Sequence, residues 1–204
     1  GLGELKGVSL LMPNYKFPSG SLNCLSSCPK LESLDFGYGQ IESAAIDALI
    51  PAGQLQRFTF GLGATTDAPL KLGRLTTRNL KKVNIFRTRL DDATLTELAG
   101  HVGIEDLRLN WVDGFTDAGI MALKNLKKLT RLELTSTKIT VEGLSALQGN
   151  KLTMLAFESD DPAHYTRVGQ MFPELTTFAL RGNVTAAALD AVAFAMPNLE
   201  RLDL

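Results

Sequence analysis

The chain has 204 residues, of which 45% are hydrophobic, and its formal net charge at pH 7 is -1. This composition lacks the excess of Lys and Arg that marks nucleic-acid binding. No apolar run approaches the ~18 to 20 residues of a membrane span, and the opening GLGELKG shows no signal-like segment. We therefore expect a soluble protein without nucleic-acid or membrane partners, either cytoplasmic or exported after signal removal.

One uneven spacing of apolar residues recurs along the whole chain. In LTRLELTSTKITVEGLS, Leu129 is followed by Leu132 and Leu134, which fit a short strand, and Thr140 suits a helix N-cap. The repeating unit is therefore predicted to be a strand, a turn and a short helix. Nine such openings start 23 to 26 residues apart, at Leu5, Leu31, Leu55, Leu80, Ile104, Leu129, Leu152, Leu175 and Leu199.

Helical periodicity follows the predicted strands. One repeat cannot bury its own apolar face, but parallel strands stacked ~4.8 Å apart and backed by helices form a continuous core. The segments expected as helices are ESAAIDALI, DDATLTELAG, TDAGIMALKNL, TVEGLSALQG and TAAALDAVAFAM. The third and seventh repeats, with ATTDAPLKLGRLTTRN and ESDDPAHYTRVGQMFPE, are expected to be less regular because of their prolines and acidic turn.

The nine openings resemble the leucine-rich repeat family, whose pattern LxxLxLxxNxL covers essentially the whole chain. TKITVEGLSAL and DGFTDAGIMAL are similar to a variant common in large bacterial proteins. LSSCPKLESLDF is similar to the cysteine-containing subclass of eukaryotic ubiquitin-ligase receptors. The resemblance implies an α/β fold, a right-handed horseshoe solenoid with a parallel sheet on the concave face and short helices on the convex face. It also implies one domain over residues 1–204.

The family's buried asparagine ladder is poorly represented. Only Asn183 stands at the ladder position, while Thr88 and Thr137 offer a hydroxyl, and Gly39 and Gly63 offer no side chain. Asn183 also begins the glycosylation sequon NVT. We expect its amide to be buried and to satisfy backbone groups of neighbouring turns, and not to carry a glycan.

The sequence contains few candidates for catalytic or metal-binding groups. Cys24 and Cys28 align with apolar columns and are expected to be buried core thiols, without a disulfide or metal. His101 is expected to be solvated or paired with a helix C-terminus. His164 follows Glu158 and two aspartates but lacks the spacing of a calcium loop, which favours an irregular acidic turn. We expect no catalytic residue, metal or cofactor.

The exposed face of the predicted sheet is the candidate site. Charges of opposite sign alternate along it, and the simplest interpretation is a self-neutralising surface. The sharper hypothesis is a stripe of aromatic, apolar and basic side chains, the types enriched at interface hot spots. The stripe consists of Tyr38, Leu62, Phe86, Arg87 and Trp111, and the charged residues Lys82 and Arg108 lie beside it; we call the whole set the predicted stripe. Trp111 could instead fold back over the core, because its repeat carries an extra residue.

The predicted function is a non-catalytic module that binds a protein or peptide through the concave face or its ascending edge. A structural spacer or self-assembling segment of a larger protein is one alternative. A targeting domain of a ubiquitin-ligase-type receptor is another. Bare strand edges at both ends of the stack would favour end-to-end self-association.

Overall fold

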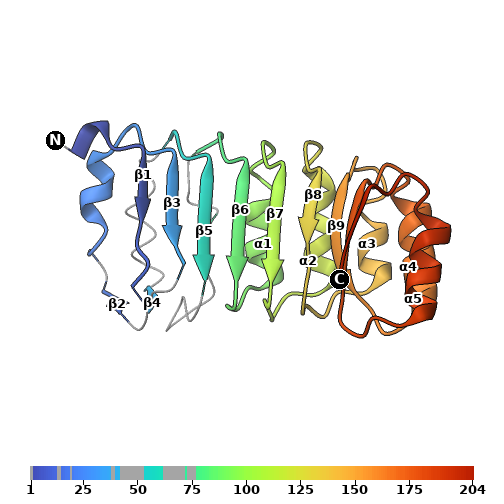
Figure 1. Cartoon of the computed structure of the whole chain (residues 1–204). Coiled ribbons are helices and arrows are strands. Elements are labelled where there is room, and N and C mark those ends of the chain that lie inside the picture. Colours follow the sequence, from blue (N-terminus) through green and yellow to red (C-terminus); the bar gives the residue numbers. More distant parts are fainter. Residues whose placement is uncertain are drawn as a thin grey trace.

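Nine strands form one parallel sheet in chain order (Figure 1). The computed structural model describes residues 2–12, 15–18, 20–37, 40–41, 53–61, 72 and 77–204. The strands are β1 (Gly7–Ser9), β3 (Ser33–Phe36), β5 (Arg57–Gly61), β6 (Lys82–Phe86), β7 (Asp106–Asn110), β8 (Arg131–Glu133), β9 (Met154–Glu158), β10 (Thr177–Arg181) and β11 (Arg201–Asp203). Every pairing in this sheet is parallel, which confirms the strand assignment made from the repeated spacing.

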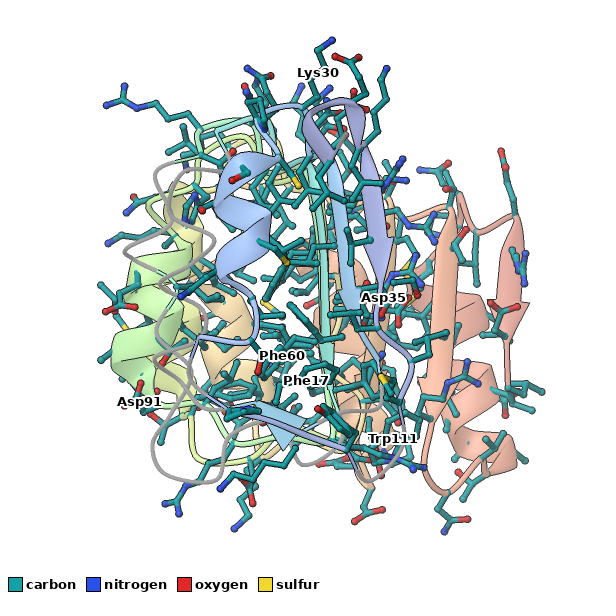
Figure 2. The ribbon with its side chains drawn as sticks, turned by 90° about the vertical axis from the view of Figure 1, so that its left-hand side faces the viewer. Phe17, Lys30, Asp35, Phe60, Asp91 and Trp111 are labelled. Carbon is teal, nitrogen blue, oxygen red and sulfur yellow. The ribbon has the colours of Figure 1, made fainter. Side chains whose placement is uncertain are left out.

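The strand register stacks equivalent leucines on one another. Leu107 pairs with Leu132, and Leu132 pairs with Leu155. All three side chains are fully buried, and they belong to one core cluster that runs through the stack. Figure 2 shows Phe17 and Phe60 inside the molecule, between the sheet and the opposite wall of the solenoid. The core is therefore shared between repeats and does not belong to any one of them.

Short helices back the sheet in its C-terminal two-thirds (Figure 1). They are α1 (Asp92–Leu98), α2 (Asp117–Ala122), α3 (Val141–Ser145), α4 (Pro162–Met171) and α5 (Ala186–Ala195), and a 3-10 turn, Leu123–Asn125, extends α2. These elements confirm the helical segments predicted after residue 90. Residues 42–50, which include ESAAIDALI, and most of ATTDAPLKLGRLTTRN lie outside the described residues.

The first repeat carries a 3-10 turn, Asn23–Ser27, where the repeats after residue 90 have α-helices. Another 3-10 turn, Leu2–Glu4, precedes β1. Because a 3-10 helix has three residues per turn, Leu22, Leu25 and Cys28 face inward and are buried, while Cys24 is exposed. The expectation that both thiols are buried was therefore wrong for Cys24. Both cysteines are free.

A second, two-stranded parallel sheet pairs β2 (Lys16–Phe17) with β4 (Gln40–Ile41). The repeated spacing of apolar residues does not predict this small sheet. Phe17 places its ring on that side of the core and contacts Phe36 edge-on, with ring centroids 6.3 Å apart. The small sheet therefore gives the first repeats an aromatic contact with the core.

Buried polar side chains link the repeats at the turns that lead into β6, β7 and β9. His101 is buried, and its Nδ1 lies 3.0 Å from the carbonyl oxygen of Thr77. Thr77 in turn donates its hydroxyl to the carbonyl of Leu55, and Asn150 donates its amide to the carbonyl of Leu126. His101 is thus a buried link between repeats, and the expected solvated or helix-end role was wrong.

Asn183 does not take the family's ladder position. The chain turns at Gly182, whose φ is 87°, and Asn183 is exposed after it. Val184, which follows with a slip of one residue in the repeat register, is 38% exposed. The prediction of a buried ladder amide at Asn183 was wrong because this slipped turn leaves the side chain outside the stack.

A second set of polar links joins consecutive helix starts. Asp92, the first residue of α1, accepts hydrogen bonds from the amide and the hydroxyl of Thr116, the N-cap of α2. Asp117, the first residue of α2, binds the amide and hydroxyl of Thr140 in the same way, at 3.0 and 2.6 Å. Both of these N-cap threonines are therefore held by a carboxylate of the preceding repeat, which adds to the local capping.

The glycine three residues after each of these threonines makes room for that carboxylate. A β-carbon added at Gly119 would lie 2.5 Å from Oδ1 of Asp92, and one added at Gly143 would collide with the carboxylate of Asp117. The glycine of the T-x-x-G element is therefore required by a close contact between repeats. It is not required for backbone flexibility.

Replacing a mid-stack leucine should be costly. We expect Leu132→Ala to lower the free energy of unfolding by ~2 to 5 kcal/mol, because its fully buried side chain leaves a cavity. Leu202→Ala is the matched control, since Leu202 stands in the same register column but is 37% exposed. Chemical denaturation of both variants checks the difference, and equal losses would contradict the stacked core.

Gly143→Ala should destabilise the protein by ~1 to 3 kcal/mol through overpacking against Asp117, although alanine is the better helix former. Gly149→Ala provides the control, because nothing lies within 4 Å of a β-carbon added there. Removing the carboxylate in Gly143→Ala/Asp117→Ala should recover part of the loss. A double variant whose loss equals the sum of the single losses in thermal denaturation would argue against the proposed contact.

Candidate protein-interaction surface

Three non-glycine residues adopt a left-handed backbone where successive strands end. The φ angles of Arg87, Trp111 and Ser136 are 49°, 54° and 53°. This conformation is uncommon for residues with side chains, and neighbouring backbone holds it here. The amide of Arg87 donates to the carbonyl of Asn110, and the amide of Trp111 donates to the carbonyl of Thr135. These hydrogen bonds between repeats therefore fix the backbone of Arg87 and Trp111, just after the ends of β6 and β7.

Arg87 and Trp111 form an exposed stacked pair. The guanidinium carbon of Arg87 lies 5.3 Å from the centre of the Trp111 ring, which is cation–π geometry. Trp111 is 53% exposed and does not fold back over the core. Figure 2 places it at the end of the sheet opposite to Lys30. Both side chains line a shallow hollow of about 390 Å³, together with Thr88, Asp113 and Ser136.

The other members of the predicted stripe are placed differently from one another. Lys82 is exposed at the start of β6. Phe86 is half-buried because its ring lies over Gly61 on the neighbouring strand, where an added β-carbon would be 2.6 Å from the ring. Tyr38 and Leu62 lie outside the described residues.

Arg108 takes part in an ion network on the concave face. Its Nε and Nη2 donate to the two carboxylate oxygens of Asp106, at 3.0 and 3.1 Å, and its Nη1 lies 3.4 Å from Glu133. The hydrogen bond to Asp106 raises the pKa of Arg108, against an opposing effect of burial. Asn110 donates its amide to Glu133 at 2.8 Å. At this point of the sheet the charges do neutralise one another.

A larger groove of about 620 Å³ lies over strands β7 to β11. Met154, Ala156 and Ala179 are buried in its floor and form an apolar cluster separate from the main core. Arg131 and Trp111 are among its lining residues, so the groove adjoins the Arg87–Trp111 pair. This groove was not predicted from the sequence, because two alanines carry no chemical signal of their own. The signal that the sequence did offer is that these two alanines stand at the same outward-facing position of two consecutive strands.

One carboxylate in the N-terminal part of this face is poorly compensated. Oδ1 of Asp35 is buried without a hydrogen-bond partner, and burial raises the pKa of Asp35, while a hydrogen bond from the backbone of Gly37 acts in the opposite direction. Figure 2 shows Asp35 on the sheet, away from Trp111. A single half-buried carboxylate does not by itself make a site.

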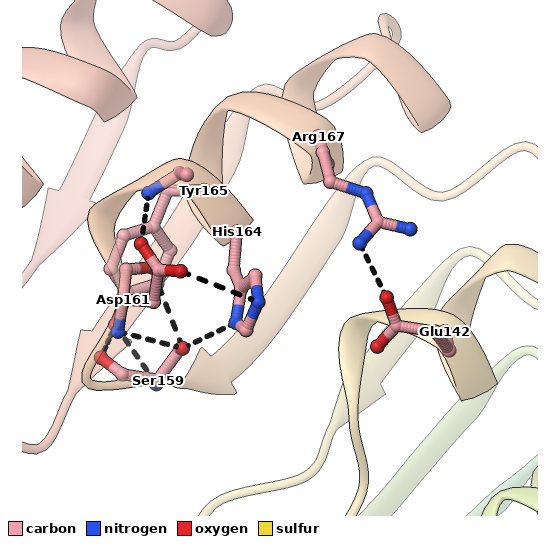
Figure 3. A network of polar contacts seen from close by, with 7 residues as sticks. Glu142, Ser159, Asp161, His164, Tyr165 and Arg167 are labelled. Atoms are coloured by element: carbon pink, nitrogen blue, oxygen red, sulfur yellow. Dashed lines mark hydrogen bonds and ion pairs between the residues drawn. The ribbon is translucent and has the colours of Figure 1, made fainter.

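The acidic turn before α4 is a capping network, as Figure 3 shows. Nδ1 of His164 lies 2.8 Å from the hydroxyl oxygen of Ser159, and Nε2 lies 3.7 Å from Asp161. That hydroxyl also accepts a hydrogen bond from the amide of Asp161, whose carboxylate caps α4 at Ala163. The buried phenol of Tyr165 donates to the carbonyl of Ser159 at 2.7 Å. These short-range contacts fix the turn, although they join the residue types of a catalytic triad.

A metal site and a membrane span are the other two features to consider. Within the described part of the chain, no group of three or more His, Cys, Asp or Glu side chains is suited to a metal ion. In the same part, no helix is both long and apolar enough to span a membrane.

The stack of parallel strands backed by helices defines a solenoid repeat protein. Residues 125–147 match the family model described as leucine rich repeat. The crystal structure of internalin C2 from Listeria monocytogenes str. 4b F2365 is similar over 100% of this chain and 82% of that chain, with a TM-score of 0.61 at 16% identity. Comparison with curated protein sequences gives no match. Residues 125–147 are thus similar to a leucine-rich repeat, and the chain as a whole has the fold of a leucine-rich-repeat solenoid, as its repeated spacing predicted.

Proposed function

We propose that this protein is a non-catalytic module that binds a protein or peptide partner through the concave face and the adjoining edge. Leucine-rich repeats stack into a solenoid, and repeat solenoids use their extended concave surfaces for binding. The observation that carries the proposal is the exposed Arg87–Trp111 pair beside a groove with an apolar floor. The proposed contact set is the predicted stripe, of which the structure describes Lys82, Phe86, Arg87, Arg108 and Trp111.

The geometry of the pair suits a binding anchor. Tryptophan and arginine dominate interface hot spots because they offer large contact areas and several donors. The left-handed backbone at Arg87 and Trp111 is held by hydrogen bonds to the next repeat, so less conformational freedom is lost when a partner docks. The spacing between strands, ~4.8 Å, places these two side chains where one partner side chain can contact both.

Truncating the anchor should separate binding from stability. We expect Trp111→Ala and Arg87→Ala each to weaken partner binding by ~2 kcal/mol or more, since both side chains are exposed and contribute little to the core. A ligand is obtained by selecting peptides from a random library against the wild-type protein. Affinity is then measured by calorimetry and stability by thermal denaturation.

The matched control is Val102→Ala, which truncates an apolar side chain that is 61% exposed at the start of the turn after α1. It should change neither affinity nor stability. The proposal fails when the selected peptides bind the Trp111→Ala and Arg87→Ala variants as tightly as the wild type. The assignment of Trp111 to the binding surface also fails if the Trp111→Ala variant unfolds, because the side chain then belongs to the core.

A second candidate function, self-association, is favoured by the apolar surface of the last repeat. Phe194 on α5 is 84% exposed, and Leu204 is 66% exposed after β11. In earlier repeats the residue equivalent to Leu204 is buried, as at Leu134 and Leu180. An edge strand with this surface, as β11 is in the described sheet, can pair with another copy of the chain.

Phe194→Glu tests this candidate in light scattering. We expect the wild-type mass to rise with protein concentration and the variant to remain monomeric, because a buried charge opposes an apolar contact. Met121→Glu, which alters a 52% exposed residue on α2 in the middle of the stack, is the control and should behave as the wild type. A wild type that stays monomeric at high concentration rejects self-association.

A further inference from the structure

The exposed charges of the concave face are basic, although the whole chain has a net charge of -1. The face is formed by the first, third and fifth residues of the strands, which alternate with the buried positions. Its exposed charged residues are Arg57, Lys82, Arg131 and Arg201. Its carboxylates are all buried or half-buried, at Asp35, Asp106, Glu133, Glu158 and Asp203.

Most of these carboxylates already have partners within the sheet. The side chain of Asp106 is 8% exposed and that of Glu133 is 17% exposed, and both contact Arg108. Oε2 of Glu158 accepts the amide of Ser136 at 2.9 Å. Asp203 accepts a hydrogen bond from Arg201. The negative charge of the face is therefore largely engaged inside the protein, and an approaching partner meets the guanidinium groups first.

Two arginines retain donors beside the apolar floor. Nε of Arg131 lies 3.7 Å from Asp106, which is too long for a hydrogen bond, and its side chain is 46% exposed. Arg181 lines the same groove, and its guanidinium group makes no hydrogen bond or ion pair with another residue in the described part of the chain. A guanidinium offers five N–H donors in a planar fork that matches a carboxylate.

We propose that the groove over β7 to β11 binds an extended acidic peptide segment of a partner protein. Carboxylates of the segment pair with Arg131 and Arg181, and an apolar side chain between them rests on Met154, Ala156 and Ala179. This inference depends on the proposed function and adds the class of partner to it. Five strands ~4.8 Å apart span roughly 19 Å, which is the length of about six extended residues.

The same features disfavour a nucleic acid. Glu133 and Asp203 line the groove and would repel a continuous phosphate chain. Single-stranded nucleic acids bind to rows of aromatic side chains, whereas this floor consists of Met154 and two alanines. An acidic peptide carries its carboxylates on flexible side chains that can turn toward the arginines.

Defined peptides test the proposal by fluorescence anisotropy. The probe is a labelled peptide in which a central leucine is flanked by glutamates. Its counterparts carry lysine for each glutamate, or serine for the leucine, and a labelled oligothymidylate represents nucleic acid. We expect the leucine-centred acidic peptide to bind most tightly, with an affinity that falls as the salt concentration rises.

Charge-removing variants locate the interaction. We expect Arg131→Gln/Arg181→Gln to weaken binding of the acidic peptide by about tenfold or more. Lys124→Gln/Lys127→Gln is the matched control, because it removes two exposed positive charges around the 3-10 turn that follows α2. It should leave the affinity unchanged, so that a loss confined to the arginine variant reports the groove and not the net charge.

Several outcomes overturn the proposal. These are equal binding of the acidic and lysine peptides, tighter binding of the oligothymidylate, no binding of the acidic probe, or equal effects of the arginine and lysine variants. If library-selected peptides lose affinity in Trp111→Ala but not in Arg131→Gln/Arg181→Gln, the acidic class is wrong and the proposed function stands. If neither change affects them, the proposed function fails as well.

Discussion

The burial of each repeat's leucines against the next repeat is the constraint on which the rest of the structure depends. Leu107, Leu132 and Leu155 stack in register and are fully buried, although each sits on a strand of only three to five residues. Such short strands are not stable in isolation, so the parallel pairing and the shared core form together. Because the core needs only the inward positions, the outward positions remain available for recognition.

Polar links fix the register that the leucines alone leave adjustable. Apolar contacts are non-directional, whereas the pairs Asp92–Thr116 and Asp117–Thr140 require one geometry at each helix start. His101 and Asn150 act similarly at the turns that lead into strands. These links lie at other positions of the repeat than the one where leucine-rich repeats carry their asparagine ladder. The chain thus satisfies the same need for directed contacts with different side chains.

The spacing of apolar residues was sufficient to predict the strands and the helices after residue 90, since it follows directly from burial. Side chains whose environment depends on a neighbouring repeat were harder to place. Cys24 is exposed because the first repeat uses 3-10 geometry, and His101 is buried because Thr77 of the preceding repeat offers a carbonyl. The groove floor at Ala156 and Ala179 was missed because its meaning arises only from the register of β9 and β10.

The stiffness of the stack also explains how a surface of near-balanced charge can select a partner by charge. Asp106 and Glu133 are held by Arg108 and Asn110, so their carboxylates cannot turn outward to meet a ligand. Arg131 lies at the same face without a full set of acceptors. A flexible surface would pair all these charges and present none. A rigid sheet separates engaged carboxylates from available guanidinium groups, and this separation is the basis of the preference for negative charge that we propose for the concave face.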